Sequence, residues 1–139
     1  RLSFGGTLQF APFGSVMIST IKIGQTTSSR VRCGFGESFT ANRNTAYVNL
    51  ASDAGGYVGL NTIQHTTLAQ TATDVAHSTN WINIKLELKP TTTDLSINSI
   101  LKATSSGTPL LKLEPNFYVL DMGFGAAVGQ IRYMECYNT

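Results

Sequence analysis

Hydrophobic and polar side chains alternate along much of the chain, and the clearest alternation runs through residues 81–89. Successive side chains of a β-strand point to opposite faces, so this rhythm predicts a strand with one buried and one solvated face. Pro90 ends that strand, because proline lacks the amide donor that a sheet needs. The segments 95–98 and 100–104 alternate again around Asn98-Ser99, which predicts a hairpin. The buried face is expected to carry Ile82, Ile84, Leu86 and Leu88.

Further segments show the same two-residue rhythm or a run of β-branched side chains. Clusters of Gly, Pro, Asn and Ser separate them at intervals of roughly 8–12 residues, which is typical of a sandwich or barrel. No segment has a helical period; residues 68–76 could form one helical turn, but their threonines favour a strand or loop. The pattern predicts an all-β, two-sheet antiparallel β-sandwich. The other expected strands are 7–13, 16–23, 30–35, 46–50, 57–60, 117–122 and 130–137.

Length and composition favour one small globular domain covering residues 1–139. With 42% hydrophobic residues and 13% charged residues, intrinsic disorder and coiled coils are both disfavoured. No apolar run reaches the length of about 18 residues that a membrane-spanning helix needs. A net charge of +2, carried by scattered basic residues, argues against a nucleic-acid partner. The charge-poor composition, rich in Thr, Ser and Asn, indicates an extracellular or virion-surface protein.

The two cysteines, Cys33 and Cys136, allow two interpretations. In the first interpretation, they form a disulfide between an early strand and the last strand. Such a disulfide would contribute up to about 4–5 kcal/mol to the free energy of unfolding in the chain-entropy model. Alternatively, they are separate buried thiols that act as small hydrophobic side chains.

The order of features in the second half of the chain resembles the concanavalin A-like jelly roll in its laminin-G-like form. A strand led by Trp81 is followed by the hairpin 95–104, a loop with prolines at 107–115, the turn Gly123-Phe124-Gly125 and the closing strand 130–135. The resemblance covers about residues 30–138, with Asn98-Ser99 in place of the Asn-Gly that is usual there. It implies a two-sheet jelly roll, a fold that hosts lectins, glycosidases, lyases, adhesins and virion proteins.

Enzymatic chemistry has little support in the residues. Hydrolysis of a glycosidic bond needs two carboxylates about 5 Å apart or somewhat wider, and Glu37 with Glu135 is the best such pair. The Glu-x-Asp-x-x-Glu motif is absent, and both residues are expected to be ordinary surface carboxylates. Gln64-His65 matches only part of an alginate-lyase signature. We therefore expect no catalytic residues.

Metal and cofactor sites are not expected either. His65 and His77 lack the spacing of metal ligands, and no carboxylate cluster supports calcium binding through Asp53, Asn61 and Asp74. The glycines of residues 123–129 match part of the glycine-rich motif that binds dinucleotide cofactors. A strand follows them where that motif requires a helix, so no cofactor is expected.

A binding surface is a stronger hypothesis. Carbohydrate recognition uses aromatic rings beside amide and carboxylate groups, and Tyr47, Tyr57 and Trp81 lie near turns rich in Asn and Asp. These three are the candidate ligand-binding residues. Trp81 has an alternative interpretation, a packing role at the start of its strand. Three arginines could form a modest basic patch, or they could simply occupy solvent-facing strand positions: Arg30, Arg32 and Arg43.

Two segments, 16–18 and 117–122, are apolar on both faces of the expected strand. The outer face of a small sandwich should contact solvent, so a second apolar face indicates that a neighbouring subunit or an extra segment covers it. The leading hypothesis is therefore a non-enzymatic structural or adhesive module that acts by self-association as a homo-oligomer or with an assembly partner. A carbohydrate-binding, lectin-like module is the alternative, followed by a glycoside hydrolase or polysaccharide lyase.

Overall fold

The computed structural model describes residues 2–3, 10–11, 13–24, 29–38, 43–51, 57–64, 67–109, 113–121 and 128–139. Every regular element in these ranges is a β-strand, as the alternation predicts. None of these residues forms a helix that is long and apolar enough to cross a membrane. The strands are β1 (Leu2–Ser3), β2 (Ser15–Ile23), β3 (Ser29–Ser38), β4 (Arg43–Ala51), β5 (Tyr57–Gln64), β6 (Thr67–Ala76), β7 (Ile82–Leu88), β8 (Thr93–Ile97), β9 (Ile100–Ser105), β10 (Glu114–Asp121) and β11 (Gly129–Asn138).

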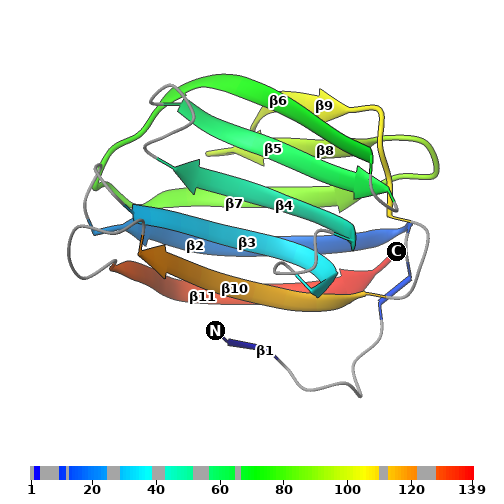
Figure 1. Cartoon of the computed structure of the whole chain (residues 1–139), viewed down its shortest axis with the longest axis horizontal. Helices are drawn as coiled ribbons and strands as arrows, with labels where there is room; N and C mark the ends of the chain where they lie inside the picture. The colour runs from blue at the N-terminus through cyan, green and yellow to red at the C-terminus, as the bar shows by residue number, and fades with distance from the viewer. Residues whose placement is uncertain are drawn as a thin grey trace.

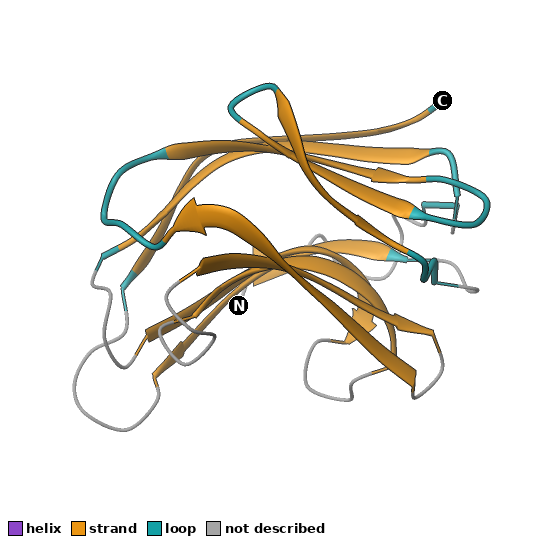
Figure 2. Ribbon diagram, turned by 90° about the horizontal axis from the view of Figure 1, so that it is seen from above, coloured by secondary structure: helices purple, strands orange, loops and turns teal. Residues whose placement is uncertain are grey.

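The strands form two antiparallel sheets that pack face to face (Figure 1). One sheet has six strands in the order β1-β10-β3-β4-β5-β6, and the other has five in the order β11-β2-β7-β8-β9. Figure 2 shows the six-stranded sheet as the arched layer, whose ends curve away from its partner. Its outer face is therefore the concave side of the molecule.

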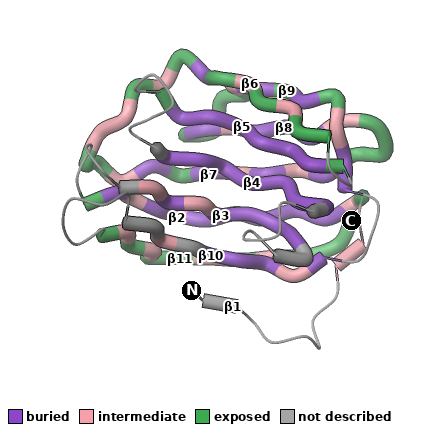
Figure 3. Tube along the Cα trace, viewed as in Figure 1, coloured by how far each residue is buried: buried purple, intermediate pink, exposed green. Residues whose placement is uncertain are grey.

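The hydrophobic core lies between the two sheets (Figure 3). Buried positions alternate along β7, whereas β4 is buried throughout residues 44–50 and β5 throughout residues 58–63. On β7, the four aliphatic side chains expected to face inward are all at most 8% exposed. The residues between them are exposed or half-buried, which confirms the predicted rhythm. On β3, Phe35 is fully buried, and its ring lies 5.6 Å from that of Phe10. Burying one such side chain stabilises the fold by roughly 1.5–3 kcal/mol.

The predicted hairpin forms between β8 and β9. Its turn residues, Asn98 and Ser99, both have positive φ angles, of 51° and 69°. Two consecutive positive φ angles define the type I′ turn, whose twist matches that of the flanking strands. The backbone amide of Asn98 also donates to the carbonyl of Asn83 on β7, 2.8 Å away, which anchors the turn to the sheet.

The middle of the chain extends the predicted strands. The alternation predicts a strand over 57–60, but β5 continues to Gln64. Asn61 looks like a turn former in the sequence, yet it pairs with β4 on one side and β6 on the other. The ambiguous segment 68–76 is entirely strand, as β6, and forms the edge of the six-stranded sheet.

One of the two doubled apolar segments is explained within a single chain. Met17 faces the core, while Val16 on the opposite face is 2% exposed. In the sheet register Val16 lies between Glu87 on β7 and Tyr137 on β11. These neighbours flank it, so its burial does not require a second subunit. In the segment 117–122, Phe117 packs in the core, and the side chains of Tyr118 and Leu120 lie outside the described residues.

Polar contacts tie the two sheets together where β6 and β9 lie side by side (Figure 1). Lys102 on β9 forms an ion pair with Asp74 on β6 at 2.9 Å. The hydroxyl oxygens of Thr62 on β5 and Ser105 on β9 lie 2.6 Å apart. Polar contacts from β9 to both β5 and β6 therefore join the two sheets on this side.

A second polar cluster stabilises the outer face of the five-stranded sheet. Lys89 donates to Asp94 at 2.5 Å, and the hydroxyl of Thr104 donates to the same carboxylate at 2.8 Å. Burial raises the pKa of the Asp94 carboxyl, but the two hydrogen bonds and the charge of Lys89 outweigh it and hold that pKa below its ordinary value.

Several sequence predictions fall outside the described residues. They include most of the expected strand 7–13, the turn 52–56 with Asp53, His65 and the turn 123–125. Within the first of these, Phe10 is described and forms an isolated antiparallel bridge with Leu113.

Candidate functional site

The concave outer face of the six-stranded sheet collects polar side chains at its centre. On β4, Ala46, Val48 and Leu50 belong to the core between the sheets, so the residues between them point outward. Directly paired residues of antiparallel strands share a face, which places the partners of these outward residues on the same side. We call this group the polar face: Arg32 on β3, Thr45, Tyr47 and Asn49 on β4, Asn61 on β5 and Asn116 on β10.

The sheet register brings these residues into adjacent rows. One row crosses four strands through Asn116, Gly34, Tyr47 and Asn61. In the next row, Arg32 is paired with Asn49. Residues from distant parts of the sequence therefore become neighbours because their strands pair.

Tyr47 is the centre of the polar face. The guanidinium carbon of Arg32 lies 4.8 Å from the centre of the tyrosine ring, within the range of a cation–π contact. The side-chain amide of Asn61 donates to the Tyr47 hydroxyl at 3.2 Å. The ring is only 2% exposed, so it is held between these groups and does not serve as an open platform.

Asn116 is fixed by the backbone at the border of the polar face. Its side-chain amide donates to the carbonyl of Gly36 at 3.3 Å and to that of Glu114 at 3.1 Å. Asn116 is 2% exposed, so these hydrogen bonds form in a largely buried environment.

Gly34 leaves room for the tyrosine. A Cβ atom built at this position would lie 2.2 Å from the carbonyl oxygen of Ala46 and 2.5 Å from the Cα of Tyr47. Real Cβ atoms do not approach backbone atoms so closely, so β3 and β4 take up this spacing only with glycine here.

Two polar atoms of this face are buried without a hydrogen bond. Thr45 is fully buried and Asn49 is 6% exposed. Thr45 Oγ1 and Asn49 Oδ1 have no hydrogen-bond partner among the described residues. An unsatisfied buried polar atom costs about 1–3 kcal/mol, and such atoms call for an explanation in a native structure. A polar ligand that hydrogen-bonds to them would remove this cost.

The structure places the three aromatic residues predicted to bind a ligand at different sites. Tyr47 lies in the polar face, and Tyr57 begins β5 on the same sheet, where it is 46% exposed. Trp81 precedes β7 in the other sheet, and the side chains of Lys22 and Arg132 lie over its ring. One ligand of ordinary size therefore does not contact all three rings.

Most of the polar face was not predicted from the sequence. Arg32 was interpreted as a solvated strand residue and Asn61 as a conceivable calcium ligand, and neither Asn49 nor Asn116 was singled out. A signal for the first three exists: the outward positions of the strands around 30–35, 46–50 and 57–64 carry Arg, Tyr and Asn. A surface strand would more often carry Lys and Glu there.

The two candidate catalytic residues lie on strands of different sheets. Glu37 lies on β3 of the six-stranded sheet, while Glu135 lies on β11 of the other sheet, exposed and accepting a hydrogen bond from the Tyr133 hydroxyl at 2.5 Å. A β-bulge between Ile131 and Tyr133 puts Glu135 on the outer face with Tyr133. Among the described residues, no group of three His, Cys, Asp or Glu side chains is arranged to hold a metal ion.

Of the two interpretations of the cysteines, the structure has the separate thiols: Cys33 and Cys136 are both free. Cys33 is fully buried, and its Sγ lies 3.6 Å from the Sδ of Met17, the residue that pairs with Cys136 in the adjacent sheet. Burial raises the pKa of each thiol to about 12, and the charge of Glu135 adds to the effect at Cys136. Both side chains therefore stay protonated and act as hydrophobic packing groups.

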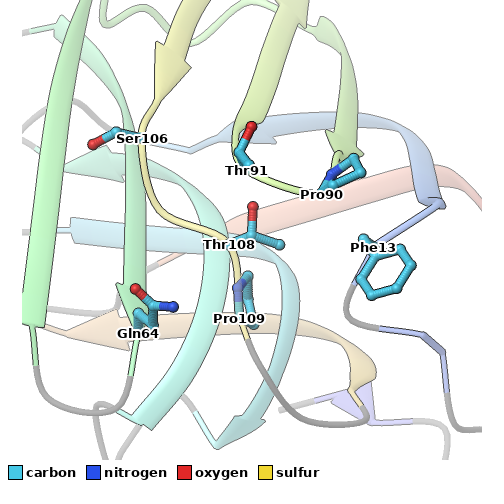
Figure 4. A pocket seen from close by; sticks show the side chains of 7 residues that line it. All are labelled: Phe13, Gln64, Pro90, Thr91, Ser106, Thr108 and Pro109. Atoms are coloured by element: carbon cyan, nitrogen blue, oxygen red, sulfur yellow. The ribbon is translucent and has the colours of Figure 1, made fainter.

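A hollow of about 370 Å³ opens at one end of the sandwich (Figure 4). Phe13, which is 56% exposed, stands on one side of it and Gln64 on the other. The remaining lining residues are Pro90, Thr91, Ser106, Thr108 and Pro109. The described lining has no charged side chain and no buried polar atom without a partner. The polar face is therefore the better-equipped candidate site.

Comparison with known proteins gives matches at the level of structure only. No family model matches the sequence, and no curated protein does. The carbohydrate-binding module CBM66 from Bacillus subtilis superposes with a TM-score of 0.71 at 10% identity, covering 94% of this chain and 77% of that one. Chicken galectin 2 superposes with a TM-score of 0.62 at 9% identity, covering 94% of both chains.

The matches also include enzymes. A variant of alginate lyase A1-II′ superposes with a TM-score of 0.67 at 8% identity, covering 97% of this chain and 66% of that one. At such identities the likeness establishes the architecture and leaves the activity open. The two antiparallel sheets and these structural neighbours together show that the chain has the concanavalin A-like jelly-roll fold, as the sequence resemblance predicts.

Proposed function

We propose that the protein is a carbohydrate-binding, lectin-like module whose ligand contacts the polar face. The observation that carries this proposal is the pair of buried acceptors without partners, Thr45 Oγ1 and Asn49 Oδ1, beside the Arg32–Tyr47–Asn61 cluster. A saccharide offers many hydroxyl groups, each of which both donates and accepts. Such a ligand satisfies acceptors and donors that lie side by side on one surface.

The geometry favours recognition through hydrogen bonds over stacking. The Tyr47 ring is almost completely covered, so a sugar ring has little aromatic surface to rest on. The expected contact is a ligand hydroxyl group donating to the side-chain oxygen of Asn49, which is 6% exposed, whereas Thr45 is fully buried behind the surface. The structural neighbours support this proposal, because their names include a carbohydrate-binding module and galectins.

We propose binding and not hydrolysis, because Glu37 and Glu135 lie on different sheets. The presence of a glucanase and a lyase among the structural neighbours keeps an enzymatic role as the alternative. We also propose an extracellular location, in keeping with the charge-poor, Thr-, Ser- and Asn-rich sequence. Location on a virion surface stays a prediction.

Asn49→Leu is expected to lower the affinity for the bound glycan by about tenfold or more, since the ligand loses its buried acceptor. Leucine has nearly the same shape as asparagine, and the lost oxygen has no partner among the described residues, so thermal stability should be unchanged or slightly raised. The ligand would be identified on a glycan array, and its affinity measured by isothermal titration calorimetry.

Asn83→Leu is the matched control. Asn83 is exposed on the outer face of the other sheet, where its side-chain oxygen accepts a hydrogen bond from Thr20. This variant should bind the glycan as the wild type does. The proposal fails if the array shows no binding, or if Asn49→Leu and Asn83→Leu bind equally well.

A second candidate function is self-association, and β11 favours it. This ten-residue strand lies at the edge of the five-stranded sheet and pairs only with β2 among the described strands. Tyr133 and Tyr137 are 49% and 37% exposed along it. A long edge strand is a template for pairing with another chain. The partner would be a second copy, with the two β11 strands antiparallel across a twofold axis.

Light scattering coupled to size-exclusion chromatography tests this candidate. The measured mass should rise from that of a monomer to that of a dimer as the protein concentration is increased. A constant monomer mass over a wide concentration range would exclude self-association as the basis of function, while leaving the carbohydrate proposal intact.

A further inference from the structure

A second group of side chains suited to ligand binding lies on the opposite side of the molecule from the polar face. Trp81 comes directly before β7 of the five-stranded sheet. The ammonium nitrogen of Lys22 on β2 lies 5.0 Å from the centre of its ring, and the guanidinium carbon of Arg132 on β11 lies 4.5 Å from it. We call these three residues the basic aromatic cluster.

The two cations of this cluster have no carboxylate partner among the described residues, whereas nearby charged residues on the same face do have partners. On the same outer face Lys85 forms an ion pair with Glu87 at 2.9 Å. Glu135 accepts a hydrogen bond from Tyr133. Within the described part of the chain, Lys22 and Arg132 contact no carboxylate, and the Trp81 ring is the only group that attracts them.

Bringing two like charges to one aromatic ring is unfavourable unless something compensates. Each cation–π contact contributes about 0.5–1 kcal/mol at an exposed site, which is enough to hold both cations beside the ring. An anionic group that reaches the cluster gains charge-assisted hydrogen bonds from the ammonium or from the guanidinium. The cluster is thus a preformed cationic site that is suited to binding an anion.

We propose that the basic aromatic cluster binds an acidic polysaccharide through its carboxylate or sulfate groups. Lys22 and Arg132 donate to these anionic groups, and Trp81 holds the two cations in place. This site lies on the other sheet from the polar face and does not depend on the function proposed for that face.

The number of cations decides in favour of a polysaccharide over a nucleic acid. Double-stranded DNA carries one charge per about 1.7 Å of its axis, and tight binding neutralises several phosphates at once. Among the described residues, two cations without an ion pair lie here, and Lys85 on the same face is already paired with Glu87. A polysaccharide whose charges are spaced more widely than those of DNA matches this sparse arrangement.

The single tryptophan of the chain provides a direct measurement, because all tryptophan fluorescence comes from Trp81. The wild-type protein would be titrated with alginate, which carries carboxylates, with heparin, which also carries sulfates, and with neutral dextran. Alginate or heparin is expected to change the emission saturably, with an affinity that falls as the salt concentration rises. Whichever of the two binds more tightly identifies the preferred anionic group.

The double variant Lys22→Gln/Arg132→Gln should reduce the affinity for the acidic polysaccharide by about tenfold or more. Lys85→Gln is the matched control, because it removes a charge from the same face outside the cluster, and its affinity should change by less than about twofold. Asn49→Leu should leave acidic-polysaccharide binding unchanged, so failure here and failure at the polar face are distinguishable. The inference is overturned if dextran gives the same response, if the double variant binds as the wild type does, or if a single-stranded oligonucleotide binds more tightly than both polysaccharides.

Discussion

Gly34→Ala is expected to lower the free energy of unfolding by about 3 kcal/mol, because an added methyl group has no room between β3 and β4. Its nearest neighbours would be the carbonyl oxygen of Ala46 at 2.2 Å and the Cα of Tyr47 at 2.5 Å. Both are backbone atoms, so no side-chain rotation relieves the clash. The two strands must separate, which disturbs the sheet at the polar face.

Gly59→Ala is the control for the chemical change itself. Gly59 lies on β5 of the same sheet, and a Cβ there would meet its nearest atoms at 3.6 Å and 3.7 Å, which is ordinary contact. This variant should differ from the wild type by less than about 1 kcal/mol. Urea unfolding followed by circular dichroism measures both, and equal stabilities of the two variants would mean that β3 and β4 do not pack as described.

Leu86→Ala is expected to lower the free energy of unfolding by about 2–5 kcal/mol. Leu86 is fully buried between the sheets and belongs to the main core cluster. Truncation removes apolar contacts and leaves a cavity that the surrounding strands fill only in part. The effect should appear as a lower urea midpoint with little change in the slope of the transition.

Lys85→Ala tests the opposite face at the adjacent position. The Lys85 side chain is 41% exposed, and its ion pair with Glu87 lies at the surface. The expected change is within about 0.5 kcal/mol. If Lys85→Ala destabilised the protein as much as Leu86→Ala, the alternation along β7 would not reflect one buried and one solvated face.

The sequence predicts those elements whose pattern is local. The aliphatic positions of β7 repeat every second residue, so the strand and its buried face follow directly. The hairpin after it follows from Asn98-Ser99 between two alternating segments, and the positive φ angles there confirm it. The β5 strand was predicted too short, because Asn61 has a turn-forming side chain but is held by strands on both sides.

The candidate site was much less predictable. Tyr47 was singled out from its aromatic ring and its position near a turn rich in Asn and Asp, but its neighbours Arg32 and Asn61 come from other strands. Register between distant strands is a tertiary property, and a shift of one residue would turn each side chain to the other face. The bulge beside Tyr133 shows this for Glu135, whose parity with Ile131 in the sequence does not survive in the sheet.

The pairing of β2 with β11 affects how the protein reaches its native state. The two strands lie far apart in the sequence, yet they are hydrogen-bonded neighbours over almost their whole length. A growing polypeptide has no partner for this side of β2 until residues 129–138 have been synthesised. Closing so long a loop is entropically costly, and topologies of this kind fold in milliseconds to seconds. The uncovered edge of β2 is therefore the part of the nascent chain most open to wrong pairing with another molecule.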